Sequence, residues 1–171
     1  MTAKHSGFTL VELLVAITVL AILVGWAIPS FSALLGENRL VASSNQLVGL
    51  INHARAEALR RGERVWVSPL AREGVAVWRN GALIWQDRNG DGVLGDDELI
   101  RQVALDEPGL RVLGVGPAAG VAPFGFNAAG FSNGELSYAL ILCASQSVTS
   151  GQRIQVSGGG QIRMVEHDNC G

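Results

Sequence analysis

Twelve consecutive residues near the middle of the chain carry the oxygen atoms that calcium prefers as ligands. Residues 87–98 read DRNGDGVLGDDE, which fits the twelve-residue calcium-loop pattern with a glycine at the sharp turn. The ligands would be the side chains of Asp87, Asn89, Asp91 and Glu98 and the backbone carbonyl of Val93. The alternative is a solvated hairpin loop, because Asp, Asn and Gly are the usual residues of turns. The segments on both sides have strand patterns, whereas an EF-hand has helices there.

Two arginines near the C-terminus, Arg153 and Arg163, fall in neighbouring predicted strands, with His167 close by. Arginines held on a rigid sheet can neutralise phosphates without reading bases, so this pair is a candidate DNA-binding site. The alternative is that both arginines are simply exposed strand residues. The formal net charge of −2 gives no global attraction to nucleic acid, so any such binding must come from a local patch.

Cys143 and Cys170 are the only cysteines. In a periplasmic domain such a pair predicts a disulfide, whereas in a cytosolic domain it would be two thiols. The sequence has no CxxC or Cys–His spacing, no G-x-S-x-G, no P-loop and no HExxH. These absences indicate that the protein is not an enzyme and requires no cofactor, calcium at residues 87–98 being the one candidate ion.

Glu12 is the one charged residue inside a long apolar run. Residues 8–28 read FTLVELLVAITVLAILVGWAI, and 21 residues are enough to cross a bilayer as a helix. A carboxylate at membrane depth costs about 2.5–3.5 kcal/mol, so Glu12 either finds a cationic partner or extends to the interface. Lys4 precedes the run, which predicts a cytoplasmic N-terminus with the rest of the chain outside the inner membrane.

The sequence around this acid, Gly7-Phe8-Thr9-Leu10-Val11-Glu12, together with Pro29 just after the apolar run, resembles the type IV prepilin signature. This resemblance implies that residues 1–7 are a leader and that a prepilin peptidase cuts between Gly7 and Phe8. The new N-terminal Phe8 would be N-methylated, and Glu12 would pair with the terminal amine of a neighbouring subunit. Other pilins, the peptidase and the inner membrane are therefore the expected partners.

The elements that carry these residues predict an α+β fold of the pilin type. One helix is expected from about Phe8 to Arg61, with its first part in the membrane and residues 29–61 amphipathic. Pro29 and Gly36 are the two candidate positions for a bend in it. Apolar residues recur at helical spacing in the second part, namely Leu47, Leu50, Ile51, Ala54 and Ala58. This stripe should pack on an antiparallel sheet formed by residues 62–171, the periplasmic head.

The head contains eight segments with strand patterns. They are Arg64–Ser68, Gly74–Arg79, Leu83–Gln86, Leu99–Leu105, Leu110–Val115, Leu136–Cys143, Arg153–Ser157 and Gln161–Val165. Glycine- and proline-rich stretches, including residues 114–130, divide these segments.

The head also resembles the FimT/FimU minor pilins and the related GspH minor pseudopilins. The residues that carry this resemblance are the Asp-rich loop, the turn Phe126-Asn127-Ala128-Ala129-Gly130, the strand end Leu142-Cys143 and the closing Gly160-Gln161-Ile162-Arg163. It implies a minor pilin for pilus initiation or the pilus tip, with a type II secretion pseudopilin as the alternative. A third reading is a FimT-like DNA receptor. Its Gly-Arg-x-Arg element is incomplete here, because Gln161 stands in place of the first arginine.

Overall fold

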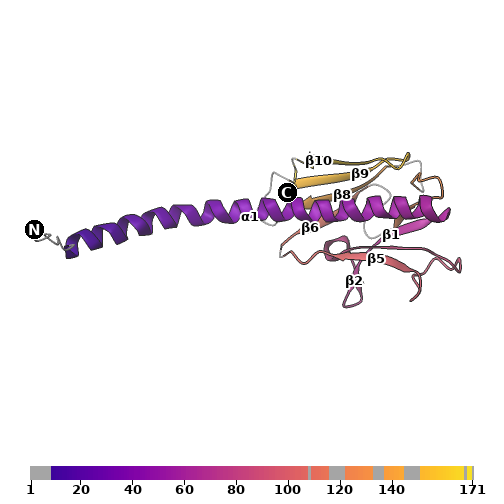
Figure 1. The fold of residues 1–171 in the computed structure, drawn as a ribbon, viewed down its shortest axis with the longest axis horizontal. Coiled ribbons are helices and arrows are strands. Elements are labelled where there is room, and N and C mark those ends of the chain that lie inside the picture. The colour runs from indigo at the N-terminus through magenta and orange to yellow at the C-terminus, as the bar shows by residue number, and fades with distance from the viewer. Residues whose placement is uncertain are drawn as a thin grey trace, which may run out of the picture. The chain divides into compact units, whose positions relative to one another are not determined.

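The computed structural model describes residues 9–107, 109–115, 122–132, 137–144, 151–167 and 169–170. A single helix, α1 (Leu10–Arg61), is followed by short strands and one 3-10 turn, which confirms the predicted α+β order (Figure 1). The chain divides into two compact units, Met1–Gly36 and Glu37–Gly171. Gly7 and Phe8 lie outside the described residues.

The first unit contains α1 up to Gly36. Every described side chain from Leu10 to Trp26 is exposed, and most of them are large and apolar. The helix continues without interruption through Pro29 and Gly36. Across the described part of the chain, no helix combines the length and the apolarity that a membrane crossing requires.

The second unit begins with the remainder of α1, residues 37–61. Its apolar stripe of Leu47, Leu50, Ile51, Ala54 and Ala58 is buried, as the helical spacing predicts. The helix ends where Gly62 adopts a positive φ of 69° and its amide donates to the carbonyl of Ala58 over 3.0 Å. A glycine in this conformation is the common helix stop.

One antiparallel sheet has the strand order β5-β4-β1-β7. Its strands are β1 (Val65–Pro69), β4 (Gly81–Trp85), β5 (Leu99–Ala104) and β7 (Phe124–Phe126). Val65 and Val67 of β1 point into the core, and Trp66 points the other way, opposite Trp85 of β4. These two rings stack with their centroids 6.2 Å apart. Trp66 and Trp85 therefore pack within the sheet, as does Trp78 within the core.

The second antiparallel sheet has the order β10-β9-β8-β6. Its strands are β6 (Arg111–Val115), β8 (Tyr138–Cys143), β9 (Gly151–Val156) and β10 (Ile162–His167). Leu140 and Leu142 of β8 and Ile154 and Val156 of β9 join the helix stripe in one hydrophobic core. Figure 1 shows β8, β9 and β10 running along the second part of α1.

Two parts of the head differ from the sequence prediction. The predicted strand Gly74–Arg79 is not continuous. Only Val75–Ala76 of it forms a strand, β3, which makes a small hairpin with β2 (Ala71–Arg72), and a 3-10 turn, η1, covers Trp78–Asn80. The buried Asn80 amide donates to the carbonyls of Leu70 and Val75, which holds the chain in this turn. The strand β7 was not predicted at all, because its three residues lie inside the glycine- and proline-rich stretch 114–130.

Candidate functional sites at the helix start, the acidic loop and the sheet end

Glu12 lies in the first turn of α1 and caps the start of that helix. Its Oε2 atom accepts hydrogen bonds from the amide and the hydroxyl of Thr9, both at 3.2 Å. The Thr9 hydroxyl in turn accepts the amide of Glu12 at 3.2 Å. This reciprocal arrangement is a capping box. The sequence spacing Thr-x-x-Glu is the signature of this motif.

The acidic loop, residues 87–98 between β4 and β5, uses its carboxylates to hold its own backbone. Asp87 accepts the amides of Gly90 (2.8 Å) and Gly92 (3.0 Å). Asp91 accepts the amide of Val93 at 2.7 Å and the side-chain amide of Asn89 at 2.8 Å. Both oxygens of Asp87 and both oxygens of Asp91 are thus acceptors within the loop.

Glu98 closes the same loop from its far end. It is buried; its Oε1 accepts the amide of Arg88 at 2.8 Å and its Oε2 accepts the amide of Gly95 at 2.9 Å. The hydrogen bonds from Gly95 and Arg88 lower the pKa of the Glu98 carboxyl below its usual range, since they favour the charged form.

The predicted calcium ligands are therefore not gathered around a common point. Among the described residues, no group of three or more His, Cys, Asp or Glu side chains could hold a metal ion. The side chains of Asp87, Asn89, Asp91 and Glu98, which would supply the side-chain oxygens for calcium, already accept hydrogen bonds from the loop backbone. In this arrangement the loop does not fit the ion, and calcium binding stays a prediction.

Arg153 and Arg163 lie on adjacent strands, as predicted, and on the same face of the sheet. Arg153 of β9 is opposite Val165 of β10, and Arg163 is opposite Gln155. Opposed residues of an antiparallel pair share a face, and so do residues two positions apart. The structure brings the two arginines to one surface, and whether DNA binds there stays a prediction.

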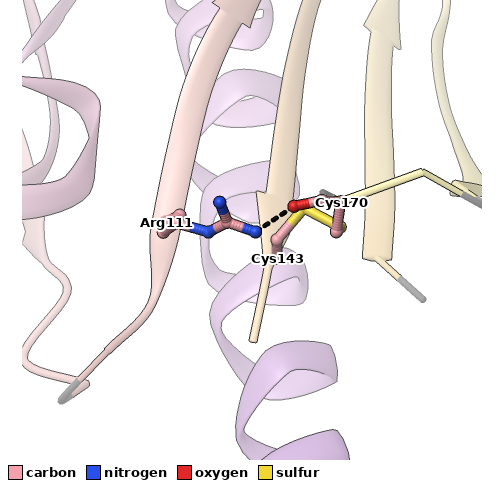
Figure 2. The surroundings of a disulfide bond; sticks show 3 residues. All are labelled: Arg111, Cys143 and Cys170. Atoms are coloured by element: carbon pink, nitrogen blue, oxygen red, sulfur yellow. Dashed lines mark hydrogen bonds between the residues drawn. A yellow bond between two sulfur atoms is a disulfide. The ribbon is translucent and has the colours of Figure 1, made fainter. Parts of the chain in front are cut away.

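The predicted disulfide is present and ties the C-terminal tail across the sheet. Cys143 at the end of β8 is bonded to Cys170, with their Cα atoms 5.8 Å apart. Gly151 of β9 pairs with Cys143 of β8 on one side and with His167 of β10 on the other. Arg111 of β6 donates to the backbone carbonyl of Cys170 (Figure 2). The tail thus reaches from the edge strand β10 to the opposite edge strand β6.

Arg55 of α1 fastens two turns to the helix, a role that no local sequence pattern indicates. Its Nε donates to the carbonyl of Gly130 at 3.0 Å and its Nη2 to that of Gly159 at 3.5 Å. Gly130 ends the turn 126–130, and Gly160 begins the segment that leads into Arg163. Both glycines have a positive φ, and Gly160 lies against the carbonyl of Gly130. These two head motifs therefore meet at Arg55.

A second missed cluster closes the C-terminal end of α1. The buried Glu57 accepts hydrogen bonds from Arg60 (2.5 Å) and from Arg61 (2.6 Å). These two arginines lower the pKa of Glu57 to about 2. Arg61 also donates to Gln86 at 2.6 Å, and Gln86 donates to Glu63. The helix end is thus joined to the end of β4, just before the acidic loop.

Three comparisons with known proteins bear on this fold. Two crystal structures of the type IV minor pilin FimU from Pseudomonas aeruginosa (strain PAO1) have the same fold at 17% sequence identity. One gives a TM-score of 0.61 and covers 79% of this chain and 97% of that chain; the other gives 0.59, with 77% and 100%. Comparison with curated proteins gives no match.

Two family models match the sequence. The model described as the prokaryotic N-terminal methylation motif matches residues 2–28. The model described as type II transport protein GspH matches residues 43–160, which is more than half of the chain and includes both sheets up to the turn before β10. The chain therefore belongs to the GspH family and carries a prokaryotic N-terminal methylation motif ahead of the GspH region.

Proposed function

We propose that this protein is a minor pilin subunit that is processed between Gly7 and Phe8 and assembled through α1. The observation that carries the proposal is the methylation motif over residues 2–28 ahead of a GspH region over residues 43–160. In the proposed state, residues 8–28 anchor the unassembled subunit in the inner membrane and the head lies on the periplasmic side. The disulfide Cys143–Cys170 agrees with an oxidising compartment.

The exposure of the first helical unit supports assembly through this segment. Leu10, Leu14 and Leu23 are about 60–80% exposed in the isolated chain, and apolar side chains occur on every side of the helix. A helix that is apolar all round is stable only inside lipid or among other helices. Lipid would cover these apolar side chains before assembly, and the helices of neighbouring subunits would cover them in the filament.

Glu12 gives this apolar segment a specific partner. Its carboxylate is exposed, and among the residues that the structure describes it is held only by Thr9, at 3.2 Å. Surrounded by other apolar helices, the charge would need a cation, and the amine of a processed Phe8 on a neighbouring subunit would supply one. We propose that this pairing sets the register of assembly and that the subunit's role is structural and not catalytic.

A type II secretion pseudopilin is the second candidate function. The family description, type II transport protein, favours it, whereas the similar solved structures are both of a type IV minor pilin. Purification from cross-linked membranes separates the two candidates. Recovery with pilus subunits supports the minor pilin, and recovery with secretion components supports the pseudopilin.

N-terminal sequencing and an assembly assay test the proposed function directly. The cellular protein should begin at an N-methylated Phe8. Glu12→Ala should lower the amount of the protein in sheared filaments by about tenfold, a loss of about 1.4 kcal/mol per contact, while its amount in membranes stays the same. Glu37→Ala, another exposed acid of α1, is the matched control. A protein that still begins at Met1, and whose incorporation is unaffected by Glu12→Ala, would overturn the proposal.

A further inference from the structure

The outer face of the β10-β9-β8-β6 sheet, the side away from the core, can be read from the strand register. Val112, Leu142, Leu140, Ile154 and Val156 belong to the core, so the alternate positions face outward. These outward positions, which we call the outer face, are Arg111, Leu113, Val115, Ala139, Ile141, Cys143, Gly151, Arg153, Gln155, Arg163, Val165 and His167.

The outer face combines apolar side chains with positive charge. One row across the sheet is Leu113, Ile141, Arg153 and Val165, of which Leu113 is 56% and Val165 40% exposed. The disulfide lies at the end of this face where Arg111, Cys143 and Gly151 are. The four strands are described throughout, and their outward positions include three arginines and no acid, although the whole chain has a net charge of −2.

Arg153 occupies the middle of that row and is half-buried. It lies between Ile141 and Val165 in the register. Its Nε atom is buried without a hydrogen-bond partner among the described residues. An arginine already held between apolar neighbours loses little side-chain entropy on binding, and the planar guanidinium suits a carboxylate.

The acidic loop has the complementary chemistry. Its five acids and one arginine give a net charge of −4, and Asp91, Asp96 and Asp97 are exposed. Beside these acids, Val93 is 65% and Leu94 39% exposed. Because the loop joins strands of the other sheet, the two surfaces are different patches of one head. Among the described residues, no hydrogen bond or ion pair joins them.

We infer that the acidic loop of one copy docks on the outer face of the next copy. Val93 and Leu94 would lie against Leu113, Ile141 and Val165. Asp96 and Asp97 would pair with Arg153 and Arg163. A contact between two different patches of identical subunits is heterologous, and such contacts repeat along an open helix. The inference rests on the proposed function, because this docking would add a contact between heads to a filament that is assembled through α1.

Charge reversal on the processed full chain in detergent micelles tests this contact. Sedimentation velocity at low salt should show self-association that weakens as salt is raised, since opposite charges attract less when screened. Arg153→Glu with Arg163→Glu, and separately Asp96→Arg with Asp97→Arg, should each weaken association by about tenfold or more. The chain that carries all four changes should associate again, because the charges are then exchanged between the patches.

The control Arg79→Glu with Arg101→Glu makes the same change in net charge as Arg153→Glu with Arg163→Glu, at exposed positions outside both patches, and should associate normally. Repeating the series in a Glu12→Ala chain separates this inference from the proposed function. Salt-sensitive association that survives Glu12→Ala belongs to the heads, whatever Glu12 does in assembly. Failure of the four-change chain to recover overturns the inference. So does a native chain that remains monomeric at low salt, whether or not it binds duplex DNA through Arg153 and Arg163.

Discussion

Gly151 lies directly beneath Cys170: a Cβ atom added to this glycine would come within 2.5 Å of the Cys170 Sγ atom. The same Cβ would lie 2.6 Å from the carbonyl oxygen of Leu142. The tail can therefore cross β9 to reach Cys143 only because position 151 has no side chain. Glycine is required here because the disulfide leaves no room for a side chain. The backbone conformation is not the reason, since Gly151 does not have a positive φ.

We predict that Gly151→Ala destabilises the oxidised full chain. The methyl group must displace either the disulfide or a strand, and overpacking of this kind costs about 1–3 kcal/mol. The free energy of unfolding by urea in detergent micelles measures the effect. The control is Gly159→Ala, because its Cβ would meet only the Ser157 hydroxyl at 3.9 Å. Equal stability of the two variants would contradict the packing described above Gly151.

Removal of the disulfide should lower the stability of the head by about 3–4 kcal/mol on the chain-entropy model. The bond joins residues 27 positions apart, so it restricts a sizeable loop in the unfolded chain. Urea unfolding with and without reductant, and of Cys143→Ser with Cys170→Ser, measures this loss. The native oxidised protein should contain no reactive thiol when denatured; two thiols would refute the pairing.

Stability should fall with acid through Glu57. Its pKa is lowered from 4.5 to about 2 by Arg60 and Arg61. The stabilisation is therefore complete above about pH 4.5 and is lost as the pH falls towards 2. Glu57→Gln should cost about 1 kcal/mol at pH 7, because the ion pairs are partly exposed, and should flatten this part of the pH profile. The control Glu73→Gln changes an exposed acid at the β2–β3 turn and should leave the profile unchanged.

The acidic loop should keep its stability when calcium is removed. Because Asp87, Asp91 and Glu98 already accept hydrogen bonds from the loop, EDTA should not change the unfolding midpoint. Glu98→Gln should lower the midpoint with or without EDTA, since it removes a buried charged acceptor. Heat on titration with calcium that disappears in Asp87→Ala would instead establish the calcium site predicted from the sequence.

Arg55→Met should release both turns that Arg55 holds. The change keeps an apolar stem but removes the donors to Gly130 and Gly159, at a cost of about 1.5–3 kcal/mol for hydrogen bonds from a charged group. Hydrogen exchange should become faster at the amides of Gly130 and Gly160, which close these turns. Arg39→Met, which removes only an exposed contact at 3.6 Å to Glu107, should leave both amides protected.

The helix and the sheet positions could be predicted because they depend on local patterns. The stripe from Leu47 to Ala58 has helical spacing, and all five of its apolar residues are buried. The strands at 99–104, 111–115 and 138–143 lie within or close to their predicted ranges. Cys143 and Cys170 are the only two cysteines of the sequence, so predicting their disulfide required only that the head lie in an oxidising compartment.

The missed features depend on contacts between distant parts of the chain. β7 contains only three residues. Its middle residue must be glycine, because a Cβ atom at Gly125 would collide with the carbonyl oxygen of Val65. Arg55 donates hydrogen bonds to Gly130 and Gly159, which are 75 and 104 residues away in the sequence. No local spacing reveals such contacts. The loop carboxylates have the composition of calcium ligands, but their hydrogen bonds to nearby amides could be seen only in three dimensions.

The capping of α1 by Glu12 has a thermodynamic consequence for a subunit that must join a filament. The carboxylate already has a partner in Thr9, so the amine of the proposed neighbouring subunit would exchange one interaction for another and would gain only the difference between them. A modest gain for each added subunit makes addition reversible. Growth and disassembly can then share one pathway, with Thr9 receiving the carboxylate again when a neighbour leaves.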